Sequence, residues 1–437
     1  MDGVVGTARA MTPPGLSSET IAVWLLAAAA FVFPFLAVVA PLGITVELAI
    51  LGTAVLPFVI RVRAWRHLPV TLLALLVALV SWAAISSLWA EMPQQAATAT
   101  LRLLGIFLAG LSSLAAGLAL APTALRPVRI ALLAGFGLVA APLLADQLAG
   151  QLLTDWTDLP TRLTETHPVK RGIVILALLI WPIRIMMRRR FTVPVQGLAI
   201  AAMITLVMFG HSSTAKLATG AGIAVTLALM LAPRRGPGMV GALLVAATLA
   251  IPLAASHLPS PRHTFQHWTF LAPSAHHRVT IWGFTAQRIA ERPILGWGMD
   301  ASRGFPGGDQ EVVVRRYVEG VRVAELTEPV LPLHPHSAVL QLWLELGAVG
   351  AVMFGVFLVW LLSRVARPPA ALRGDMAAAA MAAFIMAAGS FGFWQGWWQS
   401  SFWLTAVFTL LAMKDGSAAA GLDHTLSPPE RNESLRP

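Results

Sequence analysis

Apolar residues run along this chain in stretches of about 17 to 25 residues, separated by short polar segments, and a helix of that length crosses a hydrocarbon core of roughly 30 Å. Because helices satisfy their own backbone hydrogen bonds, the pattern predicts an all-α, polytopic membrane protein. We expect membrane helices near residues 20–38, 44–60, 69–90, 101–121, 127–145, 171–186, 194–211, 215–232, 238–255, 336–362, 375–393 and 401–413.

Basic residues between these helices are distributed unequally over the two sides of the membrane. Alternate loops carry fourteen of them: Arg61, Arg63, Arg66, Arg126, Arg129, Arg184, Arg188, Arg189, Arg190, Arg234, Arg235, Arg364, Arg367 and Arg373. The other side carries five: Arg102, Arg162, Lys170, Arg171 and Lys216. The positive-inside rule therefore places the first side and both termini in the cytoplasm, and the long connection 256–335 outside.

The pattern divides the chain into four parts, with about twelve transmembrane helices and one large external loop. They are an N-terminal bundle of helices 1–9 (1–255), the loop (256–335), C-terminal helices 10–12 (336–413) and a tail rich in Ser, Pro and Gly (414–437), predicted to be disordered. Within the loop, Ile281, Phe284, Thr285 and Ile289 follow helical spacing, which predicts short amphipathic helices lying against the membrane surface.

Composition agrees with a membrane protein and excludes several classes of function. Hydrophobic residues make up 57% and charged residues 12% of the chain, against about 25% charged residues in soluble domains. The net charge of +10 follows from the loop arginines, so no nucleic-acid partner is expected. Cysteine is absent, which excludes disulfides and a thiolate nucleophile. The first apolar run is followed by many more, so we expect a retained helix and no cleaved signal peptide.

The segment Leu-Pro-Leu-His-Pro-His-Ser opens the tenth predicted helix at its outer end. Pro335 suits a first helical turn, so His336 is predicted within that turn. At about 100° per residue, Trp343, Gly347 and Gly350 share its face, where the glycines would allow another helix to approach. A helix N-terminus disfavours imidazolium and favours an anion, so a neutral His336 beside a phosphate would be a general base. An interfacial histidine bonded to loop backbone is the structural alternative.

His336 and Ser337, followed after nine residues by Gly347 and then by Gly350, resemble a motif of the O-antigen ligase family. In that family the motif stands at the outer end of the helix that follows a large periplasmic loop. A second stretch upstream is similar to the family's R-x3-W … P-x-x-G-x-G pattern, and its residues are Arg278, Trp282, Pro293, Gly296 and Gly298.

The resemblance implies a multi-pass protein of the bacterial inner membrane with a periplasmic active site. It implies metal-independent transfer of a glycan from undecaprenyl pyrophosphate to a sugar hydroxyl of lipid A-core, with no cofactor. The partners would be that lipid-linked donor, the lipid A-core or glycan acceptor, and membrane lipid. Arg278 would hold the pyrophosphate and His336 would deprotonate the acceptor hydroxyl. A planar guanidinium that stays charged suits this leaving group.

A second arginine of the family usually stands where a helix re-enters the membrane from outside. Here the corresponding position reads Ser212-Ser213 with Lys216 further on, and Lys216 offers charge without a bidentate contact. Arg171, beside Lys170 at the start of the sixth helix, is the other candidate for the pyrophosphate. Snorkelling of either cation to lipid headgroups is the structural alternative.

Tryptophans at an outer membrane boundary, among them Trp397 and Trp403, form an aromatic belt by default. Contact with glycan or with the prenyl chain is the other interpretation, for which the candidates are Trp282, Trp394 and Trp398. Glu345, about 13 Å below His336 at 1.5 Å per residue, is predicted to make a structural contact with a neighbouring helix.

The residues leave alternatives to a ligase open. An O-antigen or exopolysaccharide polymerase would use the same lipid-linked donor and would need the same anion clamp and base. A flippase or transporter for lipid-linked sugar would instead need charged residues deep inside several helices, whereas the polar residues here gather at the outer ends.

Overall fold

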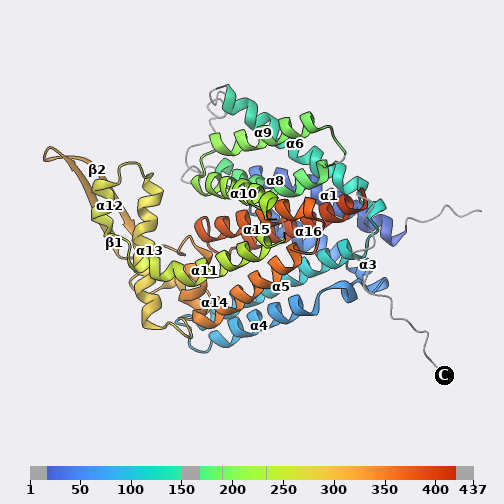
Figure 1. Cartoon of the computed structure of the whole chain (residues 1–437). Coiled ribbons are helices and arrows are strands. Elements are labelled where there is room, and N and C mark those ends of the chain that lie inside the picture. The colour runs from blue at the N-terminus through green and yellow to red at the C-terminus, as the bar shows by residue number, and fades with distance from the viewer. Residues whose placement is uncertain (1–16, 150–167, 189, 233, 420–437) are drawn as a thin grey trace, which may run out of the picture.

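The computed structural model describes residues 17–149, 168–188, 190–232 and 234–419, which fold into a helical bundle with a smaller helix-and-hairpin unit at one end (Figure 1). We refer to that end, which carries α12, α13, β1 and β2, as the hairpin end. The elements are α1 Ser18–Val39, α2 Gly43–Ala54, α3 Leu56–Arg61, η1 Ala64–His67, α4 Val70–Ser86, α5 Pro93–Ala119, η2 Pro122–Leu125, α6 Arg126–Leu148, α8 Pro168–Met187, α9 Val193–Phe209, α10 Ser213–Leu231, α11 Gly236–Ser256, α12 Pro261–His267, α13 Pro273–Glu291, η4 Ala301–Gly304, β1 Glu311–Val318, β2 Val321–Pro329, α14 Ala338–Val365, α15 Ala370–Gly389 and α16 Gly396–Ala419.

Each predicted membrane segment overlaps a helix of the structure, although the segment 44–60 is divided between α2 and α3, and the chain is a polytopic membrane protein. Eight helices of the described residues are long and apolar enough to cross a membrane, and α4 and α9 are shorter apolar helices. The last predicted segment ended at residue 413, but α16 continues to Ala419. The rest of the tail predicted to be disordered lies outside the described residues.

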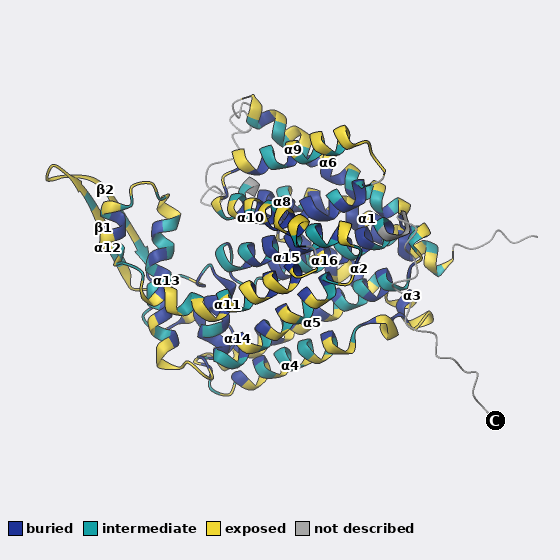
Figure 2. Cartoon of the chain, viewed as in Figure 1, coloured by how far each residue is buried: buried dark blue, intermediate teal, exposed yellow. Residues whose placement is uncertain are grey.

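α8 occupies the centre of the bundle, where it packs against α1, α15 and α16 (Figure 2). Every residue from Ile173 to Trp181 is buried, as expected for a helix that is apolar on all sides. Peripheral helices instead expose large apolar side chains, including Trp24 and Leu231, and a lipid solvent accommodates that surface. The packing of this central helix therefore fixes the positions of the residues at its start, Lys170 and Arg171.

Ion pairs join the helix ends far from the hairpin. Arg129 of α6 lies 2.7 Å from Asp415 of α16, and Arg184 and Arg188 of α8 both pair with Asp375 of α15. The arginines that the positive-inside rule assigns to the cytoplasm thus also connect the bundle helices to one another.

The loop predicted to hold only short helices also contains a β-hairpin, which corrects the all-α expectation. β1 and β2 are antiparallel, and Val318 pairs with Val321 across a two-residue turn. Both turn residues, Glu319 and Gly320, have positive φ angles of 50° and 80°, as a type I′ turn requires. The sequence signal, valines flanking Glu-Gly, was present but was not recognised.

The predicted amphipathic helix is confirmed as α13, which packs on α11 and α14. Ile281, Thr285 and Ile289 are buried on its inner face, and Phe284 is half-buried. α12 lies beside it and holds the hairpin, because the Gln266 side chain exchanges two hydrogen bonds with the backbone of Tyr317.

α14 is interrupted at Gly347, whose φ of 65° and ψ of −163° are not helical. The segment 293–298 inserts at this break and supplies hydrogen bonds that the helix lacks there. Trp297 N and Gly298 N donate to the carbonyls of Leu344 and Glu345 at 2.8 Å, and Ala348 N donates to the Pro293 carbonyl at 2.8 Å.

Gly296 and Gly347, one from each sequence block, therefore allow their two backbone segments to approach each other closely. A Cβ on Gly347 would lie 2.1 Å from the Ile294 carbonyl oxygen, and one on Gly296 would lie 2.5 Å from the Glu345 carbonyl oxygen. The sequence pattern predicts that Gly347 admits a neighbouring helix. It instead admits an extended loop segment, since positive φ and close backbone approach both require glycine.

Gly347→Ala is expected to lower the free energy of unfolding by at least about 2 kcal/mol, because a Cβ collides with backbone and the φ angle is strained. Gly355→Ala in the same helix is the matched control, since its Cβ would meet Val245 at an ordinary 3.9 Å. Thermal unfolding in detergent measures both variants. Equal melting temperatures for the two variants would contradict the inserted-loop arrangement.

Candidate active site

His336 immediately precedes α14 and does not lie within its first turn as predicted. Ser337 is the N-cap, and its hydroxyl accepts from Leu340 N. His336 itself has a left-handed backbone with φ of 53°, which turns the chain away from the helix direction. The Trp282 indole of α13 donates to the Pro335 carbonyl at 2.9 Å and holds this turn in place.

The hydrogen bond of the His336 ring decides which of its nitrogens carries the proton. Nδ1 lies 2.9 Å from the Ser390 carbonyl oxygen, which only accepts, so Nδ1 donates. In the neutral ring the lone pair then sits on Nε2. Within the described residues no group hydrogen-bonds to Nε2, so the half-buried ring presents it as a proton acceptor.

Both histidines of the Pro335 turn are uncharged at neutral pH. Burial lowers the pKa of His336 to about 4; the Ser390 carbonyl opposes this, and the charges of Arg278, His277 and Lys170 add to it. Burial likewise lowers the pKa of His334 to about 3. The neutral imidazole agrees with expectation, but its main cause is burial rather than a helix dipole.

Arg278 of α13 is half-buried and lies within electrostatic range of both histidines. Its Nε is buried without a hydrogen-bond partner, and no ion pair of Arg278 occurs in the described part of the chain. Burial also lowers the pKa of its guanidinium. A buried cation lacking a counter-ion is costly, so this position favours an anionic ligand.

The structure separates the two candidate cations, Arg171 and Lys216, and brings a third cation, Lys170, to the site. Lys170 interacts electrostatically with Arg278 and with His336. Arg171 lies over the Trp397 ring at 5.6 Å. Lys216 is half-buried on α10, and the contacts described for His336 and Arg278 do not include it.

α10 nevertheless begins close to His336. The Thr214 hydroxyl donates to the Gly389 carbonyl at 2.9 Å, and the next carbonyl, that of Ser390, is the one that holds the His336 ring.

The three candidate tryptophans are placed differently from one another. Trp394 and Trp398 are 5% and 0% exposed, so neither ring offers a face to lipid or glycan in this structure. Trp282 is half-buried beside His336 and positions the Pro335 carbonyl.

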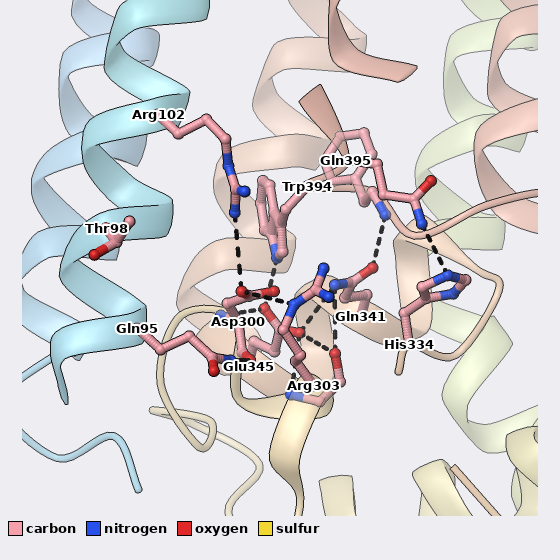
Figure 3. A network of polar contacts seen from close by, with 12 residues as sticks. Gln95, Thr98, Arg102, Asp300, Arg303, His334, Gln341, Glu345, Trp394 and Gln395 are labelled. Carbon is pink, nitrogen blue, oxygen red and sulfur yellow. Dashed lines mark hydrogen bonds and ion pairs between the residues drawn. The ribbon is translucent and has the colours of Figure 1, made fainter. Parts of the chain in front are cut away.

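Glu345 is fully buried and connects three segments through its carboxylate (Figure 3). Oε2 accepts from Asp300 N at 2.7 Å and from the Trp394 indole at 2.5 Å. Oε1 accepts from the Ser302 hydroxyl and from Gln341 Nε2. The predicted structural role is confirmed, but the partners are mainly loop residues rather than a neighbouring helix. Donors on both oxygens offset the cost of burying the charge.

The loop 390–395 between α15 and α16 was missed by sequence reasoning, which assigned most of it to a helix. The Ser390 carbonyl accepts a hydrogen bond from the His336 ring, and the Gln395 amide nitrogen lies 3.0 Å from His334 Nε2. Between them, Phe393 N donates to Gln341 and the Trp394 indole donates to Glu345. Gly392 packs against the His334 ring, where a Cβ would come within 2.6 Å. The sequence signal available for this loop was Gly392, which stands between the aromatic residues Phe391 and Phe393.

Comparison with known families bears on these residues directly. Residues 198–355 match the family model described as O-Antigen ligase. That span includes α13, the inserted segment 293–298, His336 and the break in α14, so the resemblance is confirmed for the part of the chain that forms the core of the site.

Three relatives are named "Putative polysaccharide ligase". The protein of Rickettsia conorii is 32% identical over 177 residues, which is 39% of this chain and 40% of the relative. Those of Rickettsia prowazekii and Rickettsia typhi are 31% and 30% identical over 174 residues. The matched part spans about 40% of the length of these relatives.

The lowered histidine pKa values predict how stability changes with pH. The folded chain binds fewer protons than the unfolded chain between about pH 4 and pH 6.5, so the free energy of unfolding rises with pH in this window. Stability contributed by neutral His334 and His336 is present above pH 6.5 and is lost as the pH falls toward 4.

Melting temperatures measured from pH 4.5 to 7.5 in detergent test this expectation. The wild-type slope should exceed that of a His334→Gln, His336→Gln double variant, and a variant with the wild-type slope would contradict it. His263→Gln, on exposed α12, is the control and should keep that slope.

Proposed function

We propose that this protein is a glycan transferase that moves a saccharide from undecaprenyl pyrophosphate to a sugar hydroxyl of lipid A-core, as an O-antigen ligase does. The observation that supports this most directly is the half-buried Arg278 side chain, whose buried Nε lacks a hydrogen-bond acceptor among the described residues and whose charge acts on the neutral His336. Together, Arg278 would bind the anion and His336 would act as the base. The family match and the names of the relatives support the same class of reaction.

The proposed chemistry needs one proton transfer and one displacement. His336 Nε2 takes the proton of the acceptor hydroxyl, whose oxygen attacks the anomeric carbon of the donor sugar. The bond from that carbon to the pyrophosphate oxygen breaks, and its electron pair leaves with the pyrophosphate. Arg278 offers paired donors to the developing charge, and Lys170 adds a point cation. Lys216 and Arg171 remain proposed contacts further along the pyrophosphate or its lipid.

We propose that the hairpin end faces the periplasm and that both termini are cytoplasmic. The arginines of the opposite end, which pair with Asp375 and Asp415, follow the positive-inside rule in this orientation. The site then lies just outside the bilayer, where the pyrophosphate of a membrane-anchored donor would be located.

Substitution of either active residue should abolish transfer while the protein still folds. His336→Gln is expected to reduce kcat by at least about 10²-fold, as loss of a general base does. Arg278→Gln should cause a similar loss, and Arg278→Lys an intermediate one because charge remains without the planar fork. Transfer from lipid-linked donor to lipid A-core by protein in nanodiscs is the measurement, with exposed Arg262→Gln as the control.

Activity within twofold of wild type in His336→Gln or Arg278→Gln would refute the assignment. Gene deletion separates the functions that share this donor. Lipid A-core without long chains, together with polymer accumulating on the prenyl carrier, indicates a ligase. Core capped by single repeats indicates a polymerase, and lipid-linked repeats retained on the cytoplasmic leaflet indicate a flippase.

A further inference from the structure

His277 stands next to Arg278 near the start of α13, and both nitrogens of its ring face acceptor oxygens. Nε2 lies 2.9 Å from the Pro329 carbonyl oxygen, which only accepts, so Nε2 donates. Nδ1 lies 2.6 Å from Glu328 Oε2, with which it forms an ion pair. Glu328 and Pro329 are the last two residues of β2, so His277 links α13 to the base of the hairpin (Figure 1).

Trp282, further along α13, makes a second link of the same kind. Its indole N–H donates to the Pro335 carbonyl at 2.9 Å. The two links therefore hold both ends of the segment 330–335, which contains no helix or strand and leads directly to His336. Arg278 stands between the two linking side chains in the sequence of α13.

The backbone of this segment is bonded to a different part of the external loop. Val330 N donates to the Gln310 carbonyl and Leu331 N to the Gly308 carbonyl, both at 2.9 Å. These bonds fix the segment relative to the residues that precede β1. The side chains of α13 are what fix it relative to Arg278.

The hairpin itself is attached by other contacts. The Gln266 side chain exchanges two hydrogen bonds with the Tyr317 backbone, and Arg316 Nε donates to the Phe265 carbonyl at 2.7 Å. These contacts join β1 to α12, on the side of the hairpin away from the segment 330–335. Attachment of the hairpin therefore does not depend on His277, which acts where β2 passes into the segment that leads to His336.

The ion pair also distinguishes His277 from the cations of the anion site. Both side chains of the pair are half-buried, so their attraction is less screened than that of a pair on the open surface. With Nδ1 facing Glu328 and Nε2 bonded to Pro329, the ring has no free N–H for a phosphate oxygen. Its contacts therefore suit it to hold structure in place rather than to bind the pyrophosphate.

We propose that His277 is a positioning residue of the active site. By holding the end of β2, it fixes the segment 330–336 against α13 and thereby sets where Arg278 lies relative to His336. A displacement of about 1 Å between groups that act together can cost roughly 10²-fold in rate. The inference rests on the proposed transferase function.

Two substitutions of similar size test the role of the ring N–H. His277→Met removes both contacts and should lower kcat at least about tenfold, while the KM for the lipid-linked donor stays within about threefold. His277→Gln keeps a donor for the Pro329 carbonyl and should retain kcat within about threefold of wild type. Arg315→Gln, which breaks an exposed ion pair with Glu325 within the hairpin, is the matched control and should leave both constants unchanged.

A wild-type kcat in His277→Met would overturn the proposal, and so would a His277→Gln variant as slow as His277→Met. A double-mutant cycle with Arg278→Gln separates positioning from a general loss of structure. Because His277 acts through Arg278, His277→Met should lower kcat by less than about twofold when residue 278 is already Gln. The full loss in that background would mean that His277 only supports the fold.

Hydrogen exchange of the full-length protein in nanodiscs tests the link even if the wild type transfers no glycan. Peptides covering 330–337 should exchange at least about tenfold faster in His277→Met than in wild type, whereas peptides of α15 should be unchanged. Faster exchange without any transfer would support the link and refute the transferase. Unchanged exchange would reject the link whatever the activity.

Discussion

The break in α14 at Gly347 is the constraint on which the remainder of the site depends. A helix interrupted near a membrane boundary leaves carbonyl and N–H groups without partners, and the segment 293–298 supplies these partners. Glu345 stands two residues before the break, and its carboxylate reaches Asp300, Ser302 and Trp394. One turn of one helix thereby connects the external loop, with its short helix η4, to the loop 390–395.

The charged side chains around His334 and His336 form two groups, those with an oppositely charged partner and those without one. Arg102 and Arg303 pair with Asp300, and the arginines at the far ends of the helices pair with Asp375 and Asp415, whereas Arg278 and Lys170 have no carboxylate partner within the described residues. The uncompensated positive charge also helps to keep His336 neutral, because a nearby cation opposes its protonation. The same electrostatic arrangement therefore favours an anionic ligand and maintains an imidazole able to accept a proton.

Rigid elements hold the proposed reactive groups in place. His336 is fixed by the Ser390 carbonyl at the ring and by Trp282 at the preceding peptide. Lys170 is carried by the buried central helix α8, and Arg278 by α13, whose inner face is buried against α11 and α14. In the proposed reaction, this placement of the base and of the anion-binding group would bring a bound donor and acceptor into reacting positions.

The sequence alone determined the positions of the membrane helices, the amphipathic helix α13, and the two blocks that contain Arg278 and His336. These features depend on local length, periodicity and spacing, which the chain carries without regard to its neighbours. Tertiary structure alone decided that Gly347 receives a loop, that Lys170 approaches the site, and that Trp394 and Trp398 are buried. Each of these outcomes depends on which distant segment supplies the partner, and no local pattern specifies a partner that lies far away in the sequence.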